Sequence, residues 1–468
     1  MSSPGVTITA GPSDWQIIQR NGEGLGEIAV SGTFVTNAAD FTIQVRVVDE
    51  NMNTPVLPRL DWQDAETDND AGTFSIRLLL PAGGLYRIET RVRRLSGPDK
   101  RPMRGDCIHH IGVGDIYVIA GQSNASGTGK GAAADGPALG VHLFANDESW
   151  KLATHPLEDA TGTLHPITIT SVFHGHSPWL AFGKRLLART GIPVGLIPTA
   201  LGGSRIEQWV REDGSYGSLL LNMEEMIRKA GGEIAGILWY QGESDALGPT
   251  ADDRIGRYPH RFRSLLEAFR TAAGKSGTEL PVFTAQLGAY TALDAPDPQW
   301  SRMREIQRRI AHEEQVELIV TVDCPLSDEI HISSSGNVLV GERFADAALE
   351  RIHGTPTAYR YPEPAGITVE GEADDALLLR FANVHGDWTA ARHPSDITVQ
   401  DAAGSVPIEQ YEWPGGTDIL LRLGRSLSGE VTVHGLYGAS PRPTLFDDDG
   451  RCLTPFSWTI GTVGGQSV

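Results

Sequence analysis

Short hydrophobic runs that alternate with polar residues occupy the first hundred residues of the chain. The runs FTIQVRVV (41–48), FSIRLLL (74–80) and YRIETRV (86–92) are separated by segments rich in Asn, Asp, Gly and Pro. A period of two places successive side chains on opposite faces of a strand, and the intervening residues favour tight turns. The pattern predicts an antiparallel β domain with a sandwich-like arrangement over residues 1–108.

From about residue 109 to residue 355, apolar strands alternate with helical segments. The apolar runs include DIYVIA, VGLIPTA, IAGILWY, VFTAQL and VELIVTV, and the helical segments include PWLAFGKRLLART and RFRSLLEAFRTAAG. Strands separated by helices predict an α/β domain with a parallel sheet that is covered on both faces. Sheets of this kind bind ligands at the carboxyl ends of their strands.

The β pattern returns after about residue 356, in LLLRFANV, DITVQD, DILLRL and EVTVHGLY. The segment GTPTAYRYPEP before it is rich in Pro, Gly and Tyr and has the composition of a linker. A chain of 468 residues is long enough for two or three domains. We therefore expect three domains: β domain 1–108, α/β domain 109–355 and β domain 356–468.

The net charge of −20 is spread along the chain rather than gathered in a tail. An acidic surface repels nucleic acid and anionic membranes, so neither is expected as a partner. The sequence contains no run of about 18 apolar residues, so no membrane span is predicted. The three cysteines match no disulfide framework and no zinc motif. The first residues lack the features of a secretory signal, so a cytoplasmic location is expected unless a leader was trimmed. The oligomeric state stays open, a homo-oligomer included.

Polar segments follow the strands of the α/β domain and should gather at one edge of its sheet. They are GQSN (121–124), GGSRIEQW (202–209), QGESD (241–245) and, in a loop before the last helix, DEIH (328–331). Gly, Ser and Asn also favour ordinary turns, so each segment taken alone says little. Together they suggest a nucleophile with its supporting groups.

Ser123 becomes a nucleophile only if a base accepts its proton, and a histidine titrates in the useful range. Asp328 and His331 are three residues apart, so one short turn brings the carboxylate to the imidazole that it would orient. The backbone amides of Ser123 and Gly203 are candidate donors to the oxyanion, since glycine allows close approach of the backbone. The side-chain amide of Gln241 is the candidate third donor.

Taken in order, these four segments resemble the motif blocks of the SGNH hydrolase superfamily, and within it the sialate O-acetylesterase and carbohydrate esterase branch. The resemblance is strong over residues 109–350, moderate over the last hundred residues and only architectural over the first hundred. It implies a three-layer, flavodoxin-like catalytic domain between two β domains. It also implies a serine esterase that removes O-acetyl groups from carbohydrate through an acyl-enzyme, without a metal or an organic cofactor. The roles implied are nucleophile for Ser123, base and then acid for His331, orienting carboxylate for Asp328 and oxyanion donor for Gly203.

The chain departs from the superfamily pattern in two places. The third block lacks the usual asparagine, and Gln241 is the expected replacement; alternatively, Gln241 and Glu243 form a buried polar network. Arg205 stands where relatives often have a small residue or proline. It is expected either to contact an anionic or polar substrate or to pair with Glu207 or Glu243.

Other candidates for contact with the substrate are Asn124, Glu243, Trp209 and His176. Asn124 either holds the loop together or binds substrate, and Trp209 is either structural or a platform for a sugar ring. His176 forms a His-x-His pair with His174, but no carboxylate or cysteine completes a metal site nearby in the sequence. A pocket wall or helix cap is therefore favoured there, and no metal is expected.

Two other function classes remain as alternatives. One is an SGNH esterase or lipase acting on esters that are not sugars, although the insert GTGKGAAADGPALG is small and polar rather than an apolar lid. The other is a non-catalytic carbohydrate-binding protein, and the joint presence of Ser123, Asp328 and His331 counts against it.

Overall fold

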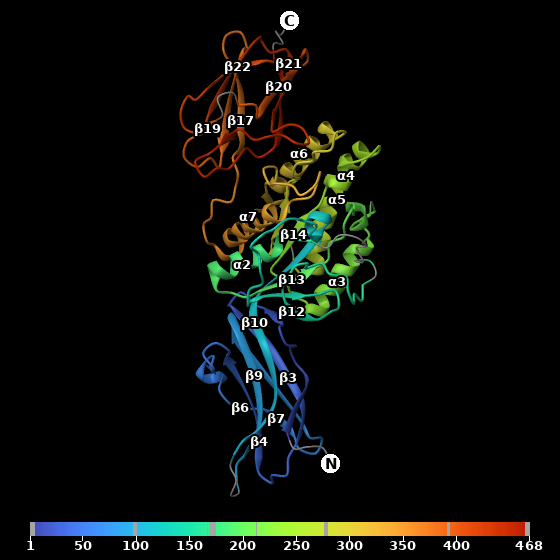
Figure 1. Cartoon of the computed structure of the whole chain (residues 1–468), viewed down its shortest axis with the longest axis vertical. Helices are drawn as coiled ribbons and strands as arrows, with labels where there is room; N and C mark the ends of the chain where they lie inside the picture. Colours follow the sequence, from blue (N-terminus) through green and yellow to red (C-terminus); the bar gives the residue numbers. More distant parts are fainter. Residues whose placement is uncertain are drawn as a thin grey trace.

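The computed structural model describes residues 5–96, 101–165, 167, 175–211, 213–275, 279–390 and 394–463. The molecule is elongated, with a β-rich region at each end and the helices gathered between them (Figure 1). Three separate hydrophobic cores correspond to these regions. In the described part of the chain, no helix combines the length and apolarity that a membrane span requires.

The N-terminal region packs two β layers around a core of alternating apolar residues. One layer has the strand order β1-β3-β8-β7, and in the other β4 pairs with β9 and β9 with β10. Alternate residues of β3 are buried, as its period-two pattern predicts. The strands are β1 (Gly5–Ala10), β2 (Ile17–Gln19), β3 (Leu25–Val35), β4 (Phe41–Asp49), β5 (Thr54–Pro55), β6 (Gln63–Asp64), β7 (Glu66–Asp68), β8 (Thr73–Pro81), β9 (Gly83–Arg94) and β10 (Met103–Gly121).

Strand β10 is 19 residues long and joins the N-terminal region to the central one. Its first half pairs antiparallel with β9, and its second half lies parallel to β13 and β14. The domain boundary predicted after residue 108 falls inside this strand. A continuous strand makes a stiff connection, because its backbone is hydrogen-bonded along both halves.

The central sheet has the order β12-β11-β13-β10-β14-β15-β16, parallel except for β12 at its edge. Helices α2 and α7 pack together on one side of it, and α3 and α5 lie on the other (Figure 1). The elements are α1 (Ser123–Ser126), β11 (Val141–Phe144), β12 (Trp150–Leu152), α2 (Trp179–Thr190), β13 (Val194–Pro198), α3 (Ser218–Ala230), β14 (Gly236–Tyr240), α4 (Glu243–Ala246), α5 (Ala251–Ala272), β15 (Val282–Ala285), α6 (Asp297–Glu314), β16 (Glu317–Ile319) and α7 (Ser334–His353). The predicted α/β fold class, with its parallel sheet between β-rich regions, is confirmed.

The C-terminal region follows α7 and consists of small antiparallel sheets. Two of them have the orders β17-β18-β23-β22 and β21-β20-β24-β26, and their apolar faces share one core. Val320 and Val322, which follow β16, belong to this core, so the C-terminal region packs directly on the end of the central sheet. The strands are β17 (Glu363–Glu370), β18 (Ala376–Ala382), β19 (Thr389–Ala390), β20 (Ile397–Asp401), β21 (Gly404–Val406), β22 (Ile408–Glu412), β23 (Ile419–Leu423), β24 (Gly429–Gly435), β25 (Leu445–Phe446) and β26 (Phe456–Val463).

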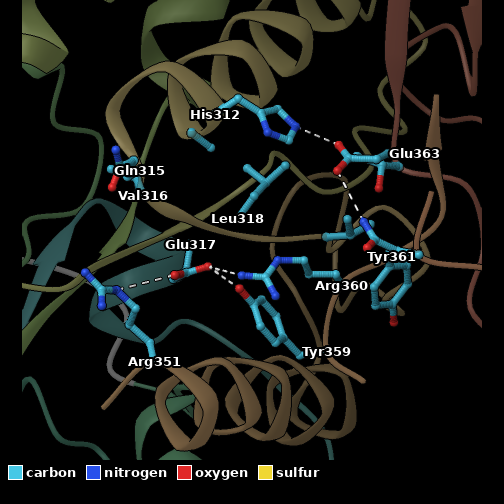
Figure 2. A pocket seen from close by; sticks show the side chains of 14 residues that line it. His312, Gln315, Val316, Glu317, Leu318, Arg351, Tyr359, Arg360, Tyr361 and Glu363 are labelled. Atoms are coloured by element: carbon cyan, nitrogen blue, oxygen red, sulfur yellow. Dashed lines mark hydrogen bonds and ion pairs between the residues drawn. The ribbon is translucent and has the colours of Figure 1, made fainter. Parts of the chain in front are cut away.

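A cavity of about 540 Å³ lies where the central and C-terminal regions meet (Figure 2). Glu317, at the start of β16, forms an ion pair with Arg360, whose Nη2 lies 3.2 Å from Glu317 Oε2. The same carboxylate accepts a hydrogen bond from the Tyr359 hydroxyl. Across the cavity, His312 Nε2 lies 2.7 Å from Glu363 Oε2. Because both acids are already paired with neighbouring side chains, this cavity forms part of the junction between the two regions. It contains none of the residues that the sequence predicted for the site.

Candidate active site

Two parallel strands end together and bring two of the predicted segments side by side. Gly121, the last residue of β10, pairs in register with Tyr240, the last residue of β14. Gly121 has a φ of +129°, and a Cβ there would lie 2.1 Å from the Tyr240 carbonyl oxygen. A glycine is therefore required for the chain to leave the sheet here. The consequence is that Gln122 and Gln241 follow at the same sheet edge, as the sequence predicted.

Ser123 begins the short helix α1 directly after this turn. The loop after β13 approaches it from the next strand, and a Cβ on Gly202 would lie 3.9 Å from the Ser123 Cβ. Gly203 follows with a φ of +72°, and a Cβ there would have no neighbour within 4 Å. Among the described residues, no hydrogen bond engages the backbone amide of Ser123 or of Gly203. Both amides are therefore available to a ligand oxygen.

The DEIH segment forms a turn that presents its histidine to the serine. Ser327 N donates to the His331 carbonyl at 2.8 Å, which closes the turn before α7 begins. His331 Nε2 lies 3.0 Å from Ser123 Oγ, and its Nδ1 lies 2.9 Å from Asp328 Oδ2. The structure thus aligns carboxylate, imidazole and hydroxyl in one chain of hydrogen bonds. Such a chain can remove the serine proton and stabilise the resulting imidazolium.

Asp328 is held in its ionised form by the turn that carries it. Burial opposes ionisation, but the backbone amides of Ile330 and His331 donate to Oδ1 at 3.0 and 2.8 Å. These bonds and the His331 ring outweigh the burial and keep the pKa of the Asp328 carboxyl below its ordinary value. The carboxylate is therefore charged at neutral pH and fixes the proton of His331 on Nδ1.

Asn124, the residue after Ser123, connects α1 to the turn that carries His331. Its Nδ2 donates to Glu243 Oε1 at 2.8 Å and to the Ile330 carbonyl at 3.3 Å, and its Oδ1 accepts from Ile332 N at 3.0 Å. The residue is only 4% exposed. This corrects the expectation that Asn124 contacts the substrate, because its amide is buried and used for bonds on both sides of His331.

Glu243 and Gln241 belong to a buried polar network beneath the site. Burial raises the pKa of Glu243, with the hydrogen bond from Asn124 acting against it. Gln241 Nε2 lies 2.6 Å from Asp245 Oδ2 and also contacts the Ser204 carbonyl and Gln122 Oε1. With its two N–H groups already used, the Gln241 amide does not reach an oxyanion. This corrects its prediction as third donor, and the burial of Glu243 corrects its prediction as a substrate contact.

Trp209 and His176 also lie away from solvent. Trp209 is fully buried and packs edge-on against Trp239 at 5.2 Å, so no ring face is free for a sugar. The side chain of His176 is 10% exposed and faces Asp135 rather than the triad. This corrects the prediction that Trp209 and His176 contact the substrate. His174, its predicted neighbour in a His-x-His pair, lies outside the described residues.

Arg205 is placed differently from the other candidates. Its side chain is 45% exposed and lies 3.8 Å from Glu207 Oε1, which is a loose ion pair. Together with Gly203 it lines a cavity of about 590 Å³, and neither Ser123 nor His331 is among the described residues that line it. Its remaining lining residues are Glu207, Gln208, Ser244, Leu247 and Gly248. A cavity of this volume accommodates a small ligand.

The sequence analysis did not predict a role for two residues whose side chains accept hydrogen bonds from the backbone of neighbouring loops, Gln122 and Asp245. Gln122 Oε1 accepts from Ser244 N at 3.2 Å, and Asp245 Oδ2 accepts from Ile206 N at 3.0 Å. Both stand inside motifs that the sequence singled out, which was the available signal. They were missed because their side chains act on the backbone of another loop, and no local pattern encodes that pairing.

Comparisons with known proteins identify the family and the fold of the chain. The family model described as "Carbohydrate esterase, sialic acid-specific acetylesterase" matches residues 113–350. A probable carbohydrate esterase from Arabidopsis thaliana is 29% identical over 258 residues, which cover 50% of this chain and 90% of that protein. The crystal structure of a carbohydrate acetylesterase from Xanthomonas citri superposes with a TM-score of 0.66 at 21% identity, covering 97% of this chain and 99% of that one.

A second solved structure, of an Arabidopsis thaliana protein, covers 50% of this chain and 98% of its own at 24% identity, with a TM-score of 0.43. The Xanthomonas citri structure shows that the fold extends over both β-rich regions. The family model covers β14, the end of β10 and both loops that bear Ser123 and His331. The resemblance noted in the sequence is thus confirmed: this chain belongs to the carbohydrate esterase family of sialic acid-specific acetylesterases and is a carboxylic ester hydrolase.

Proposed function

We propose that this chain removes O-acetyl groups from carbohydrate and that Ser123 forms the acyl-enzyme. The observation that carries the proposal is the unbroken chain of contacts from Asp328 through His331 to Ser123, at 2.9 and 3.0 Å. A neutral imidazole with its proton fixed on Nδ1 presents a lone pair on Nε2 to the serine hydroxyl. Ser123 is therefore the group that can attack an acetyl carbonyl.

In the first half of the reaction, His331 takes the Ser123 proton while Oγ attacks the acetyl carbon. The negative charge on the carbonyl oxygen is held by the amides of Ser123 and Gly203. One such donor contributes about 3–4 kcal/mol to the transition state. The imidazolium then protonates the sugar oxygen, the ester bond breaks, and the sugar leaves with a free hydroxyl.

In the second half, His331 takes a proton from water, which attacks the acetyl-serine. The same two amides hold the second oxyanion, and the imidazolium returns the proton to Ser123 as acetate leaves. Asp328 stays ionised throughout and stabilises the imidazolium in both halves. The nearby cavity that Arg205 lines is suited to the sugar, and the guanidinium favours a sugar that carries a carboxylate, such as a sialic or uronic acid.

The test is acetate release from three esters: an O-acetylated sialic acid, an acetylated xylo-oligosaccharide and an aryl acetate. Ser123→Ala should lower kcat by more than about 10⁴-fold on every ester that the wild type cleaves. Ser335→Ala, an exposed serine near the start of α7, is the matched control and should keep full activity. Equal turnover by the wild type and Ser123→Ala would exclude the nucleophile.

Substrate class is decided by the same panel. We expect Arg205→Ala to raise KM for the carboxylate-bearing ester about tenfold and to leave the neutral esters unchanged. A wild type that cleaves only the aryl acetate would favour the alternative of an esterase that does not act on sugars. An Arg205→Ala variant with unchanged selectivity would show that the substrate carboxylate binds elsewhere or is absent.

A further inference from the structure

Three side chains that the proposed reaction does not use converge beside the segment that follows the nucleophile. Asp135 and His155 lie in loops on either side of β11 and β12, and His176 precedes α2. Asp135 Oδ2 lies 3.0 Å from His155 Nε2 and 3.1 Å from His176 Nε2. One ligand atom from each of the three residues can be chosen so that all lie within 4.8 Å of one another. The cluster is thus compact enough to share one ion.

The carboxylate of the cluster is buried, the two histidines are largely buried, and one histidine makes no ring hydrogen bond among the described residues. The exposed fraction of the side chain is 3% for Asp135, 17% for His155 and 10% for His176. Among the described residues, neither ring nitrogen of His176 has a partner in hydrogen-bond geometry, although Nε2 is directed at the Asp135 carboxylate. Burying an imidazole without a hydrogen bond is costly, so such groups in folded proteins call for a ligand.

From this geometry we propose that Asp135, His155 and His176 bind a divalent transition-metal ion of the Zn²⁺ type. Two imidazoles and one carboxylate are a donor set that such ions prefer, with a fourth position left for water. Bonds of about 2.0–2.1 Å in a tetrahedron place the ligand atoms about 3.3 Å apart. The two distances from Asp135 Oδ2 are within a few tenths of an ångström of that value.

Two contacts compete with the metal and set its affinity. Lys184 Nζ lies 3.0 Å from Asp135 Oδ1 and places a positive charge next to the ion. Ser177 N donates to His155 Nδ1 over a long 3.4 Å, which places the ring proton on Nε2. When the metal binds Nε2, this proton must move to Nδ1 and the long bond to Ser177 breaks. The site is therefore expected to be moderate in affinity and to strengthen when the lysine charge is removed.

The site would act on the loop after the nucleophile rather than on the reaction. Gly129 and His176 exchange two backbone hydrogen bonds, at 3.0 and 2.9 Å, and Gly175 N donates to the Gly127 carbonyl at 3.0 Å. Asn337 Nδ2 of helix α7 donates to the His176 carbonyl at 2.7 Å. An ion that fixes the His176 side chain thus also fixes residues 127–129. We expect it to stabilise the fold, while hydrolysis itself proceeds through other residues.

The experiment is titration of the full, tag-free chain with Co²⁺ and Zn²⁺. The wild type should bind one Co²⁺ with the visible absorption of a four-coordinate ion, and Zn²⁺ should displace it. His176→Gln and Asp135→Asn should each weaken binding by more than tenfold, and Lys184→Met should tighten it about tenfold. His312→Gln is the matched control, because His312 also contacts a carboxylate but lies at the interdomain cavity.

Thermal unfolding gives a readout that does not depend on esterase activity. A bound ion should raise Tm of the wild type and of Ser123→Ala alike, and leave Tm of His176→Gln unchanged. The unfolding curves without metal also show whether Asp135→Asn folds, and His155→Gln replaces it if it does not. One equivalent of Co²⁺ bound equally by the His176 and His155 variants would overturn the proposal. So would the absence of binding by both the wild type and Lys184→Met.

Discussion

Replacing Asn124 by alanine tests whether the buried network positions the histidine. The substitution removes three hydrogen bonds, of 2.8, 3.3 and 3.0 Å, and two of them hold the backbone on either side of His331. The amide of Ile332, a fully buried residue, is left without its acceptor, at a cost of about 1–3 kcal/mol. We expect the turn to shift until this amide finds another acceptor, and such a shift changes the distance from His331 to Ser123.

The size of the expected effect follows from that movement. A shift of about 1 Å in a catalytic group lowers the rate on the order of 10²-fold, which corresponds to about 2.7 kcal/mol in the barrier. We therefore expect Asn124→Ala to lower kcat about 100-fold, with KM changed less than about threefold because Asn124 is buried away from substrate. Labelling of Ser123 by a fluorophosphonate should slow by the same factor, since it uses the same proton transfer.

Asn222→Ala is the matched control for this experiment. Asn222 is a buried asparagine on α3, and its amide has no hydrogen-bond partner among the described residues. The Asn222→Ala variant should therefore keep the kcat and the labelling rate of the wild type. Circular dichroism shows whether Asn124→Ala is folded. If the folded variant is labelled at Ser123 as fast as the wild type, the position of the His331 turn does not depend on the Asn124 hydrogen bonds and the reasoning fails.

Further predictions concern the carboxyl groups and the glutamine of the site. Gln241→Met removes the donor to Asp245, so it should lower the free energy of unfolding by about 2–3 kcal/mol and change kcat only modestly. A loss of about 10²–10³-fold in kcat with an unchanged free energy of unfolding would instead show that Gln241 is an oxyanion donor. Asp328 has a lowered pKa in the folded state, so it stabilises the fold above about pH 4 and this contribution disappears as the pH falls further. In urea unfolding between pH 3 and pH 7, the free energy of unfolding of the wild type should exceed that of Asp328→Asn by an amount that shrinks at acid pH. A difference between the two free energies that stays constant with pH would contradict this. Glu243 has a raised pKa, so its ionisation destabilises the fold as the pH rises above about 4.3. Glu243→Gln should become progressively more stable than the wild type between pH 4 and pH 8, and parallel unfolding profiles would count against the buried acid.

The positions of the proposed reacting groups were predictable because local rules place them. Asp328 and His331 are three residues apart in one turn, and that turn aligns them whatever the rest of the chain does. Ser123 and Gly203 follow apolar strands, and parallel strands end at a common edge. The separation of some 200 residues between Ser123 and His331 therefore gave no difficulty.

The amides and acids behind these groups were less predictable. A sequence motif contains Asn124, Gln241 and Glu243 but does not say which partner each amide or carboxyl selects. That choice depends on which polar groups are buried together, because a buried group without a partner is costly. The tertiary structure assigned the two amides to backbone and carboxylate partners on neighbouring loops rather than to substrate.

Patterns of hydrophobicity, turn residues and short spacings determined the α/β class, the flanking β regions and the Ser-His-Asp arrangement. The tertiary structure alone decided that β10 continues through the predicted boundary after residue 108, and that Asp135 and His155 face His176. The physical reason is the range of the interactions: periodicity and turns act within a few residues, whereas the burial of a charge or an imidazole is resolved by whichever distant groups the folded chain brings into contact.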